Sequence, residues 1–316
     1  MTLQEFKIKK EEFISFLEVE KNLSKHTKSA YNSDLDQFIF FWNKLEQAGP
    51  TSIKNTIDRF FIYLFNKRIN SSSIARKVSC FKSLEKFLKR SEIKLDLHLT
   101  RPRLEKKLPV YLSIQEITNL LDVHAYKLPT KCPLREKAIL ELLYATGIRC
   151  SELVNIKMQN IDFNQKTVLV KGKGSKERIA LFNNTTKEKI LNYIEVERSA
   201  IEHPSEFLFL NNRDEQLSTR AIQRTLKMFR KFLNIEKSIT PHKIRHSFAT
   251  HLLNKGVDIR TLQELLGHKS LSSTEKYTHV TLGHLTEICN TLHPINFMNS
   301  AAPDVAEGEG WDDNSE

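Results

Sequence analysis

Residues 240–253 read TPHKIRHSFATHLL, a stretch that predicts one helix with a buried face and a polar face. Thr240 suits the N-cap and Pro241 suits the first helical position. The apolar residues at four-residue steps are expected to face a core: Ile244, Phe248 and Leu252. His242 and Arg245, three residues apart, then lie on one face of the first turns. A histidine beside an arginine near free backbone N–H groups suits a base next to a phosphate.

Upstream, residues 145–153 read ATGIRCSEL and predict a break between two helices. Gly147 is expected to close the first helix and Ser151 to cap the second. Arg149 then lies on a short, pinned loop, from which a guanidinium can hold a phosphate through two parallel hydrogen bonds. The alternative is a structural arginine paired with a carboxylate.

A hairpin is expected where Thr167–Val170 and Arg178–Phe182 flank a glycine-containing turn. Gly172 in that turn lets the backbone approach a ligand closely. Lys173 at the tip could enter an active site and donate a proton. A merely flexible basic turn is the alternative.

Two further segments follow the first helix. A helix is expected to begin at Asp258 and end at Gly267, so that His268 emerges just past it. Ser272 opens a capping-box pattern, which predicts Tyr277 on the second turn of a short helix. A tyrosine hydroxyl attacks poorly unless a base and cations stabilise its oxyanion. Structural roles for both residues stay open.

Residues 1–98 are expected to form a separate four-helix domain. One helix follows Ser24, and its apolar stripe consists of Tyr31, Leu35, Phe38, Trp42 and Leu45. Residues 66–90 hold eight bases and a single acid around a second stripe, with Ser71–Ser73 as the expected cap. This basic face is either a solvated surface or a DNA contact. The lack of compensating acids favours DNA, and the expected contacts are Ser73, Arg76, Lys77, Lys82 and Lys86.

Charge and composition indicate the kind of partner that the chain binds and the nature of its remaining segments. The 316 residues carry a net charge of +11, which favours an acidic partner such as nucleic acid. Residues 304–316 hold six acids and no base, so residues 1–303 carry +17, and 300–316 is expected to be an acidic disordered tail. Residues 99–109 contain two prolines without an apolar period and are expected to link the first domain to a second, mostly helical domain over 110–299.

The same composition excludes several classes of protein. Nine glycines and nine prolines are too few for a turn-rich all-β protein, so the expected fold is mainly α. The four cysteines lie far apart without metal-ligand spacing, which predicts free thiols in a reducing cytoplasm and no metal site. The apolar runs are too short to span a membrane, and the first residues lack a secretory pattern.

Taken together, these segments resemble the tyrosine recombinase (phage integrase) family, and within it the Xer branch of XerC/XerD type. The likeness lies in six residues in order: Arg149, Lys173, His242, Arg245, His268 and Tyr277. Their successive separations are 24, 69, 3, 23 and 9 residues. The His293-Pro294 pair is also similar to the end of Xer chains, whereas the acidic extension after it is unusual.

The resemblance implies an N-terminal core-binding (SAM-like) domain and a mostly helical catalytic domain with a small antiparallel sheet. It implies strand cleavage without metal, ATP or other cofactor, in which Tyr277 forms a 3′-phosphotyrosyl link. Arg149, Arg245 and His268 would contact the phosphate. His242 would help deprotonate Tyr277, and Lys173 would protonate the leaving 5′-oxygen.

The implied partners are double-stranded DNA and sister protomers in a tetrameric complex, alone or with a second Xer-type recombinase. The helix at 282–292 would dock into a neighbouring protomer, and a DNA translocase of the cell-division apparatus is a further expected partner. The implied role is resolution of chromosome or plasmid dimers at a dif-like site, with a mobile-element integrase as the alternative. A type IB topoisomerase or a catalytically idle DNA-binding protein are the other rivals.

Overall fold

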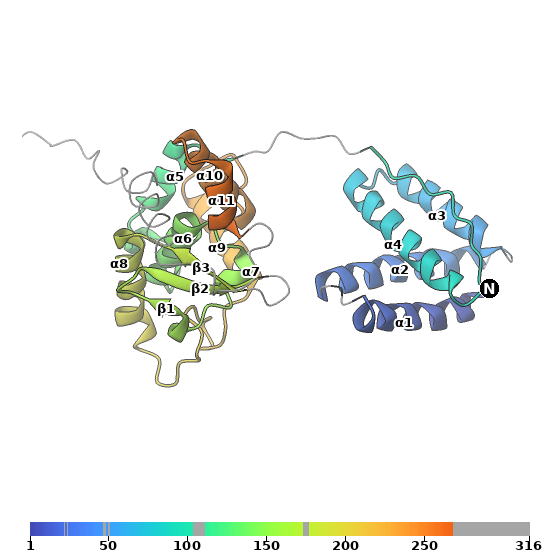
Figure 1. Cartoon of the computed structure of the whole chain (residues 1–316), viewed down its shortest axis with the longest axis horizontal. Helices are drawn as coiled ribbons and strands as arrows, with labels where there is room; N and C mark the ends of the chain where they lie inside the picture. The colour runs from blue at the N-terminus through green and yellow to red at the C-terminus, as the bar shows by residue number, and fades with distance from the viewer. Residues whose placement is uncertain are drawn as a thin grey trace, which may run out of the picture. The chain divides into compact units, whose positions relative to one another are not determined.

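The computed structural model describes residues 1–21, 23, 25–46, 49, 51–103, 111–172 and 177–267. The chain divides into two compact units, Met1–Leu108 and Pro109–Glu316 (Figure 1). Each unit has a hydrophobic core of its own. The mainly helical fold expected from the composition is confirmed.

Four helices form the N-terminal unit: α1 (Leu3–Val19), α2 (Lys25–Glu46), α3 (Ile53–Asn66) and α4 (Ser71–Lys89) (Figure 1). Their shared core is rich in aromatic rings. The ring centroid of Phe38 on α2 lies 5.1 Å from that of Phe6 and 5.2 Å from that of Phe81, both in edge-to-face geometry. Such pairs stabilise a core beyond their buried area. Most of the apolar stripes expected on α2 and α4 are buried in this core.

The start of α4 differs by one residue from the expectation. Asn70, rather than a residue of Ser71–Ser73, is the N-cap, and its side chain accepts a hydrogen bond from the backbone N–H of Ser72 at 3.0 Å. Asparagine caps a helix as well as serine does, so the first favourable side chain in the sequence takes the position. Ser24, the expected cap of α2, lies outside the described residues.

A buried carboxylate on α2 fixes the basic helix α4. Asp34 accepts hydrogen bonds from Arg76 Nε at 2.9 Å, from Arg76 Nη2 at 2.8 Å and from Lys77 Nζ at 2.6 Å. The side chain of Arg76 is 46% exposed, but that of Lys77 is only 3% exposed. The prediction that Lys77 contacts DNA is therefore wrong, because its ammonium is buried and bound to Asp34.

Asp34→Ala is expected to lower the free energy of unfolding of the N-terminal unit by about 3–5 kcal/mol, since it leaves the Lys77 ammonium buried without its carboxylate. The fluorescence of the buried Trp42 during urea unfolding measures this. Glu20→Ala is the control, because it removes a carboxylate from a pair with Arg90 in which both side chains are exposed, 58% and 54%, and it should cost about 1 kcal/mol or less. Equal losses in the two variants would contradict this account.

The second unit combines helices with one small sheet. Its helices are α5 (Ile114–Leu121), α6 (Pro133–Thr146), α7 (Cys150–Leu153), α8 (Asn184–Asn192), α9 (Thr219–Phe232), α10 (Pro241–Asn254) and α11 (Ile259–Leu266), with a π-helical turn at Tyr193–Arg198. Its antiparallel sheet has the order β1 (Ile161–Asp162), β2 (Thr167–Lys171) and β3 (Glu177–Leu181). The expected hairpin is confirmed, with Val170 paired to Arg178 and Lys171 to Glu177. Among the described residues, no helix is both long and apolar enough to cross a bilayer.

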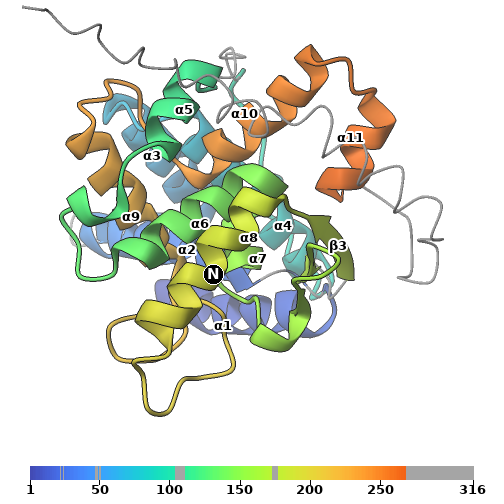
Figure 2. The same ribbon diagram turned by 90° about the vertical axis from the view of Figure 1, so that its left-hand side faces the viewer.

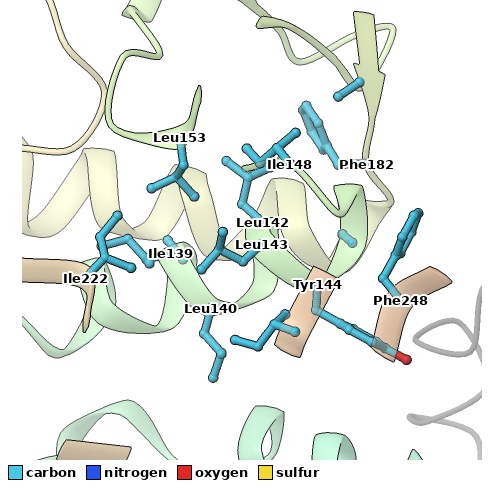
Figure 3. Packing of buried hydrophobic residues seen from close by; sticks show 14 of the residues in the cluster. Ile139, Leu140, Leu142, Leu143, Tyr144, Ile148, Leu153, Phe182, Ile222 and Phe248 are labelled. Carbon is cyan, nitrogen blue, oxygen red and sulfur yellow. The ribbon is translucent and has the colours of Figure 1, made fainter. Parts of the chain in front are cut away.

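Helix α6 runs through the middle of this unit, in contact with α8 and α10 (Figures 1 and 2). All of its residues after Pro133 are buried, which explains why no polar face is visible in its sequence. Figure 3 shows Leu142 and Leu143 of this helix in one cluster with Ile222 of α9, Phe248 of α10 and Phe182, the residue that follows β3. The site described below is built on the C-terminal end of this helix.

Helix α6 also buries an ionisable pair, Lys137 and Glu141, one turn apart. Burial raises the pKa of Glu141 from 4.5 to about 7, although the charge of Lys137 opposes the shift. The native state therefore holds this proton more tightly than the unfolded chain does, and stability should fall by about 3 kcal/mol as the pH rises from 4.5 to 7.

Glu141→Gln is expected to remove most of that fall, because the amide does not titrate. Urea unfolding followed by circular dichroism at pH 5 and pH 7.5 checks this, with the exposed Glu202→Gln as the control, because the charge of Glu202 is not among those that shift the pKa of Glu141. An unchanged pH dependence in Glu141→Gln protein would show that another group is responsible.

Candidate active site

The site begins at the turn between α6 and α7. Gly147 ends α6 in the left-handed conformation, with φ of 57°, as expected. A Cβ at this position would lie 2.5 Å from Cδ1 of Phe248 on α10, so only glycine allows the two helices to approach this closely. The predicted cap of the next helix is wrong by two residues: α7 begins at Cys150, and Arg149 rather than Ser151 occupies the N-cap position.

The carboxylate of Glu152 explains that shift. Its Oε2 accepts the backbone N–H of Arg149 at 2.8 Å, and its Oε1 accepts Nη1 of the same residue at 2.8 Å. The side chain of Glu152 is 2% exposed and that of Arg149 is 41% exposed. A buried carboxylate therefore holds both the backbone and one guanidinium nitrogen of Arg149, while part of the arginine side chain stays open to solvent. The alternative considered for Arg149, a pairing with a carboxylate, is present without burying the arginine.

A second arginine binds the same carboxylate from the sheet. Nη2 of Arg178 on β3 donates to Glu152 Oε2 at 3.0 Å, and both side chains are buried. Burial acts to raise the pKa of Glu152, but the charge of Arg178 and the hydrogen bonds from Arg149 outweigh it and hold that pKa below its ordinary value. Glu152 is thus the ionised centre of a cluster of arginines.

Arg245 brings α10 into this cluster. Its guanidinium donates through Nη1 to the carbonyl of Gly147 and through Nη2 to the carbonyl of Leu266 at 2.8 Å. It therefore joins the turn before Arg149 to the end of α11. Burial, together with the positive charges of Arg149 and Arg178, lowers the pKa of Arg245 to about 10. Arg245 remains charged at neutral pH, in a place that already holds excess positive charge.

The end of α11 lies against Arg178. The helix begins at the N-cap Asp258 and ends at Gly267, with φ of 66°, both as expected. A Cβ at Gly267 would lie 2.5 Å from Cδ and 2.6 Å from Nε of Arg178. The stem of the arginine thus packs on the backbone immediately before His268.

Of the other expected site residues, only His242 lies within the described part of the chain. His242 is exposed on the first turn of α10, which is capped by Thr240 as predicted. The predicted core face of this helix is buried: Ile244, Phe248 and Leu252. Lys173, His268 and Tyr277 lie outside the described residues, as do the expected helix at 282–292 and the acidic tail.

The described part of the site favours an anion. Three guanidinium groups surround one carboxylate, which leaves an excess of two positive charges, and Arg149 is the partly exposed member. A phosphate placed beside Arg149 would relieve this excess and accept charge-assisted hydrogen bonds. The sequence singled out Arg149 and Arg245 but not Glu152 or Arg178. The available signal for Glu152 was a glutamate within the first turn of the helix expected after Gly147, where a carboxylate is favoured.

Protein-family models match segments in both units of the chain. Residues 111–284 match the model of the phage integrase family, and residues 11–92 match that of the phage integrase N-terminal SAM-like domain. The chain is 38% identical over 295 residues to tyrosine recombinase XerC of Oceanobacillus iheyensis, covering 89% of this chain and 94% of that protein. It is 40% identical over 287 residues to tyrosine recombinase XerC of Staphylococcus aureus, covering 90% and 96%.

Solved structures share the fold at lower identity. The XerH site-specific recombinase bound to a palindromic difH substrate superposes with a TM-score of 0.65 at 22% identity, covering 86% of this chain and 81% of that one. A lambda integrase dimer bound to a core site gives 0.61 at 18% identity, covering 85% and 96%. The similarity to the XerC proteins over about 90% of the chain, together with the two family matches, shows that the chain belongs to the phage integrase family, as a tyrosine recombinase of the Xer branch.

Proposed function

We propose that this recombinase resolves chromosome or plasmid dimers at a dif-like DNA site in the cytoplasm. The match to XerC proteins over 94–96% of their length supports this role, since it includes both units of the chain. The observation that carries the chemistry is the arginine cluster. Arg149 and Arg245 are 96 residues apart in sequence, yet both are anchored at the turn containing Gly147.

In the proposed reaction, Arg149 and Arg245 stabilise the negative charge on the nonbridging oxygens of the scissile phosphate. Charge-assisted donors fixed before the reaction stabilise a transition state without the cost of reorganising during it. Arg149 supplies the accessible guanidinium. The buried Arg245 contributes the electrostatic field of its positive charge and fixes the turn at Gly147. His268, which follows Gly267 directly, adds a hydrogen bond to the phosphate.

The covalent step belongs to Tyr277. Its phenolic oxygen forms a bond to phosphorus and releases its proton with the help of His242, while the bond from phosphorus to the 5′-oxygen breaks. Lys173 gives a proton to that oxygen, which leaves as a 5′-hydroxyl. The phosphodiester energy stays in the 3′-phosphotyrosyl link. A 5′-hydroxyl from a second duplex can therefore reverse the step and exchange strands without ATP.

The N-terminal unit is proposed to hold the duplex through α4. The candidates are Arg76, whose guanidinium is oriented by Asp34 and 46% exposed, the exposed Lys86 and the partly buried Ser73 and Lys82. Phosphate contacts of this kind fix position on DNA and do not read its sequence. The structure of the XerH complex with DNA supports this class of partner.

Four protomers are proposed to assemble on two DNA sites, either as copies of this chain or with a second Xer-type recombinase. A contact from the segment at 282–292 to the next protomer would be heterologous and would close a ring. A DNA translocase of the cell-division apparatus is the further partner that this role proposes.

A nicked suicide DNA carrying the recombination site tests the proposal. Cleavage next to the nick releases a short strand that diffuses away, so the wild-type protein is expected to accumulate an adduct that resists denaturation. Two labelled duplexes with the site should then be joined to each other, which a topoisomerase does not do. Relaxation of supercoils without joining would exclude the recombinase role, and absence of any adduct would exclude the covalent chemistry.

A further inference from the structure

We propose that Arg178 is a positioning residue for strand cleavage, which holds the phosphate-binding Arg149 and Arg245 in place without touching the DNA itself. This inference rests on the proposed function. Arg178 is the second residue of β3 and pairs with Val170 of β2, so its backbone is fixed by the sheet. Its side chain is 8% exposed, while that of its neighbour Glu177 is exposed.

Arg178 reaches Arg149 through Glu152. Nη2 of Arg178 donates to Oε2 of Glu152 at 3.0 Å, and the same oxygen accepts the backbone N–H of Arg149 at 2.8 Å. The other oxygen of Glu152 holds Nη1 of Arg149. The arginine of β3 thereby fixes the orientation of the carboxylate, and the carboxylate fixes both the backbone and the guanidinium of Arg149.

Arg178 reaches Arg245 through the end of α11. Its Cδ and Nε occupy the space beside Gly267 that a Cβ would need, 2.5 and 2.6 Å from that position. One residue earlier, the carbonyl of Leu266 accepts Nη2 of Arg245 at 2.8 Å. The two arginines thus contact adjacent residues of one helix end, so a displacement of Arg178 would move the carbonyl that orients Arg245.

A purely structural explanation accounts poorly for an arginine here. A strand residue buried against a glycine could be apolar, and replacement of a buried ion pair by apolar side chains is often neutral or stabilising. At this position the charge instead adds to two other guanidinium groups around one carboxylate. Such an arrangement suits a site that must present an oriented positive field to an anion.

The test compares Arg178→Met and Arg178→Lys proteins on two suicide DNAs. One carries the normal scissile phosphate, and the other carries an uncharged methylphosphonate at that position. Methionine keeps an unbranched stem against Gly267 and removes the charge. On the normal phosphate we expect Arg178→Met protein to bind DNA with unchanged affinity and to cleave about 100-fold more slowly. Arg178→Lys, which can make one bond to Glu152, should recover part of the rate.

On the methylphosphonate DNA, Arg178→Met protein should cleave less than about 10-fold more slowly than the wild-type protein does on the same DNA, because no nonbridging charge has to be stabilised. Arg135→Met is the matched control, since Arg135 is also buried and paired with a glutamate, Glu136, in the same unit. Its cleavage rate, measured at a temperature where it is folded, should be similar to wild type on both DNAs. If Arg178→Met fails to fold, the same comparison is made with Arg178→Lys.

Two results would overturn the proposal. The first is a wild-type rate for the variants on the normal phosphate. The second is a defect of equal size on both DNAs, which would mean that Arg178 acts on the leaving group or only on the fold. Failure of the wild-type protein to form an adduct with the normal DNA would instead reject the proposed function, so the two failures are distinguishable.

Discussion

Tyr277→Phe protein is expected to form no covalent adduct with the nicked suicide DNA and to join no strands, while it still binds the site. The substitution removes a single oxygen, the atom proposed to attack phosphorus, and a phenyl ring has no other nucleophile. The measurement is the labelled DNA strand that stays attached to protein after denaturation and disappears on protease treatment. Peptide mapping of the wild-type adduct should place the nucleotide on Tyr277.

Tyr126→Phe is the control for this change. Tyr126 lies in the same unit, is 69% exposed and loses the same oxygen, but it belongs to the turn after α5, away from the arginine cluster. This variant should form the adduct at the wild-type rate. A robust adduct from Tyr277→Phe protein would rule out Tyr277 as the nucleophile and with it the residue roles proposed above.

Glu152→Gln is expected to damage both stability and cleavage. The amide has nearly the shape of the carboxylate, but its NH2 group would face an arginine donor, and the buried Arg178 would lose its counter-charge. Removal of one partner of a buried ion pair costs about 3–5 kcal/mol, so we expect a loss of about 3 kcal/mol in the free energy of unfolding. Thermal unfolding followed by circular dichroism measures it.

Cleavage by Glu152→Gln protein, assayed where the variant is still folded, should be slower by at least about 100-fold. Arg149 would lose the acceptor that fixes both its backbone and its guanidinium, and a misplacement of about 1 Å in a charged group costs rates of that order. DNA binding should change little, because the net positive charge of the cluster increases.

Glu116→Gln provides a matched control for the capping contribution. Glu116 is the third residue of α5, as Glu152 is of α7, and each accepts the backbone N–H of its N-cap residue; Glu116 also binds a cation, Lys237. It lies at the surface, away from the arginines, so its substitution should cost about 1 kcal/mol or less and leave cleavage unchanged. If Glu152→Gln cleaves DNA as fast as Glu116→Gln does, Glu152 does not orient Arg149.

Local features of the fold could be predicted from the sequence because their causes are local. Thr240 with Pro241, Asp258, and the glycines at 147 and 267 mark helix ends through the conformations or side-chain caps of a few adjacent residues. The hairpin of β2 and β3 follows from two apolar stretches around a glycine-containing turn. Predictions failed by one residue at Asn70, where several polar side chains compete for one cap, and by two at Arg149, whose backbone N–H is bound by the carboxylate of Glu152.

The candidate site was predicted only in part. The family resemblance singled out Arg149 and Arg245 as predicted phosphate ligands, but the sequence could not distinguish a solvated base from a buried one. Lys77 belongs to a stretch of evenly distributed bases, and only the packing of α4 on α2 shows that it faces Asp34. Its neighbour Arg76 binds the same carboxylate and remains half exposed.

By itself, the sequence determined the helical class of this protein, the two regions of the chain and the family to which its six ordered site residues point. The tertiary structure decided how the arginines are held. Glu152 and Arg178 are 26 residues apart, and Arg245 meets carbonyls 98 and 21 residues away. Such contacts depend on which helix ends the core brings together. Burial then turns ordinary charged residues into an oriented cluster, because a charge removed from water must find its partner within the protein.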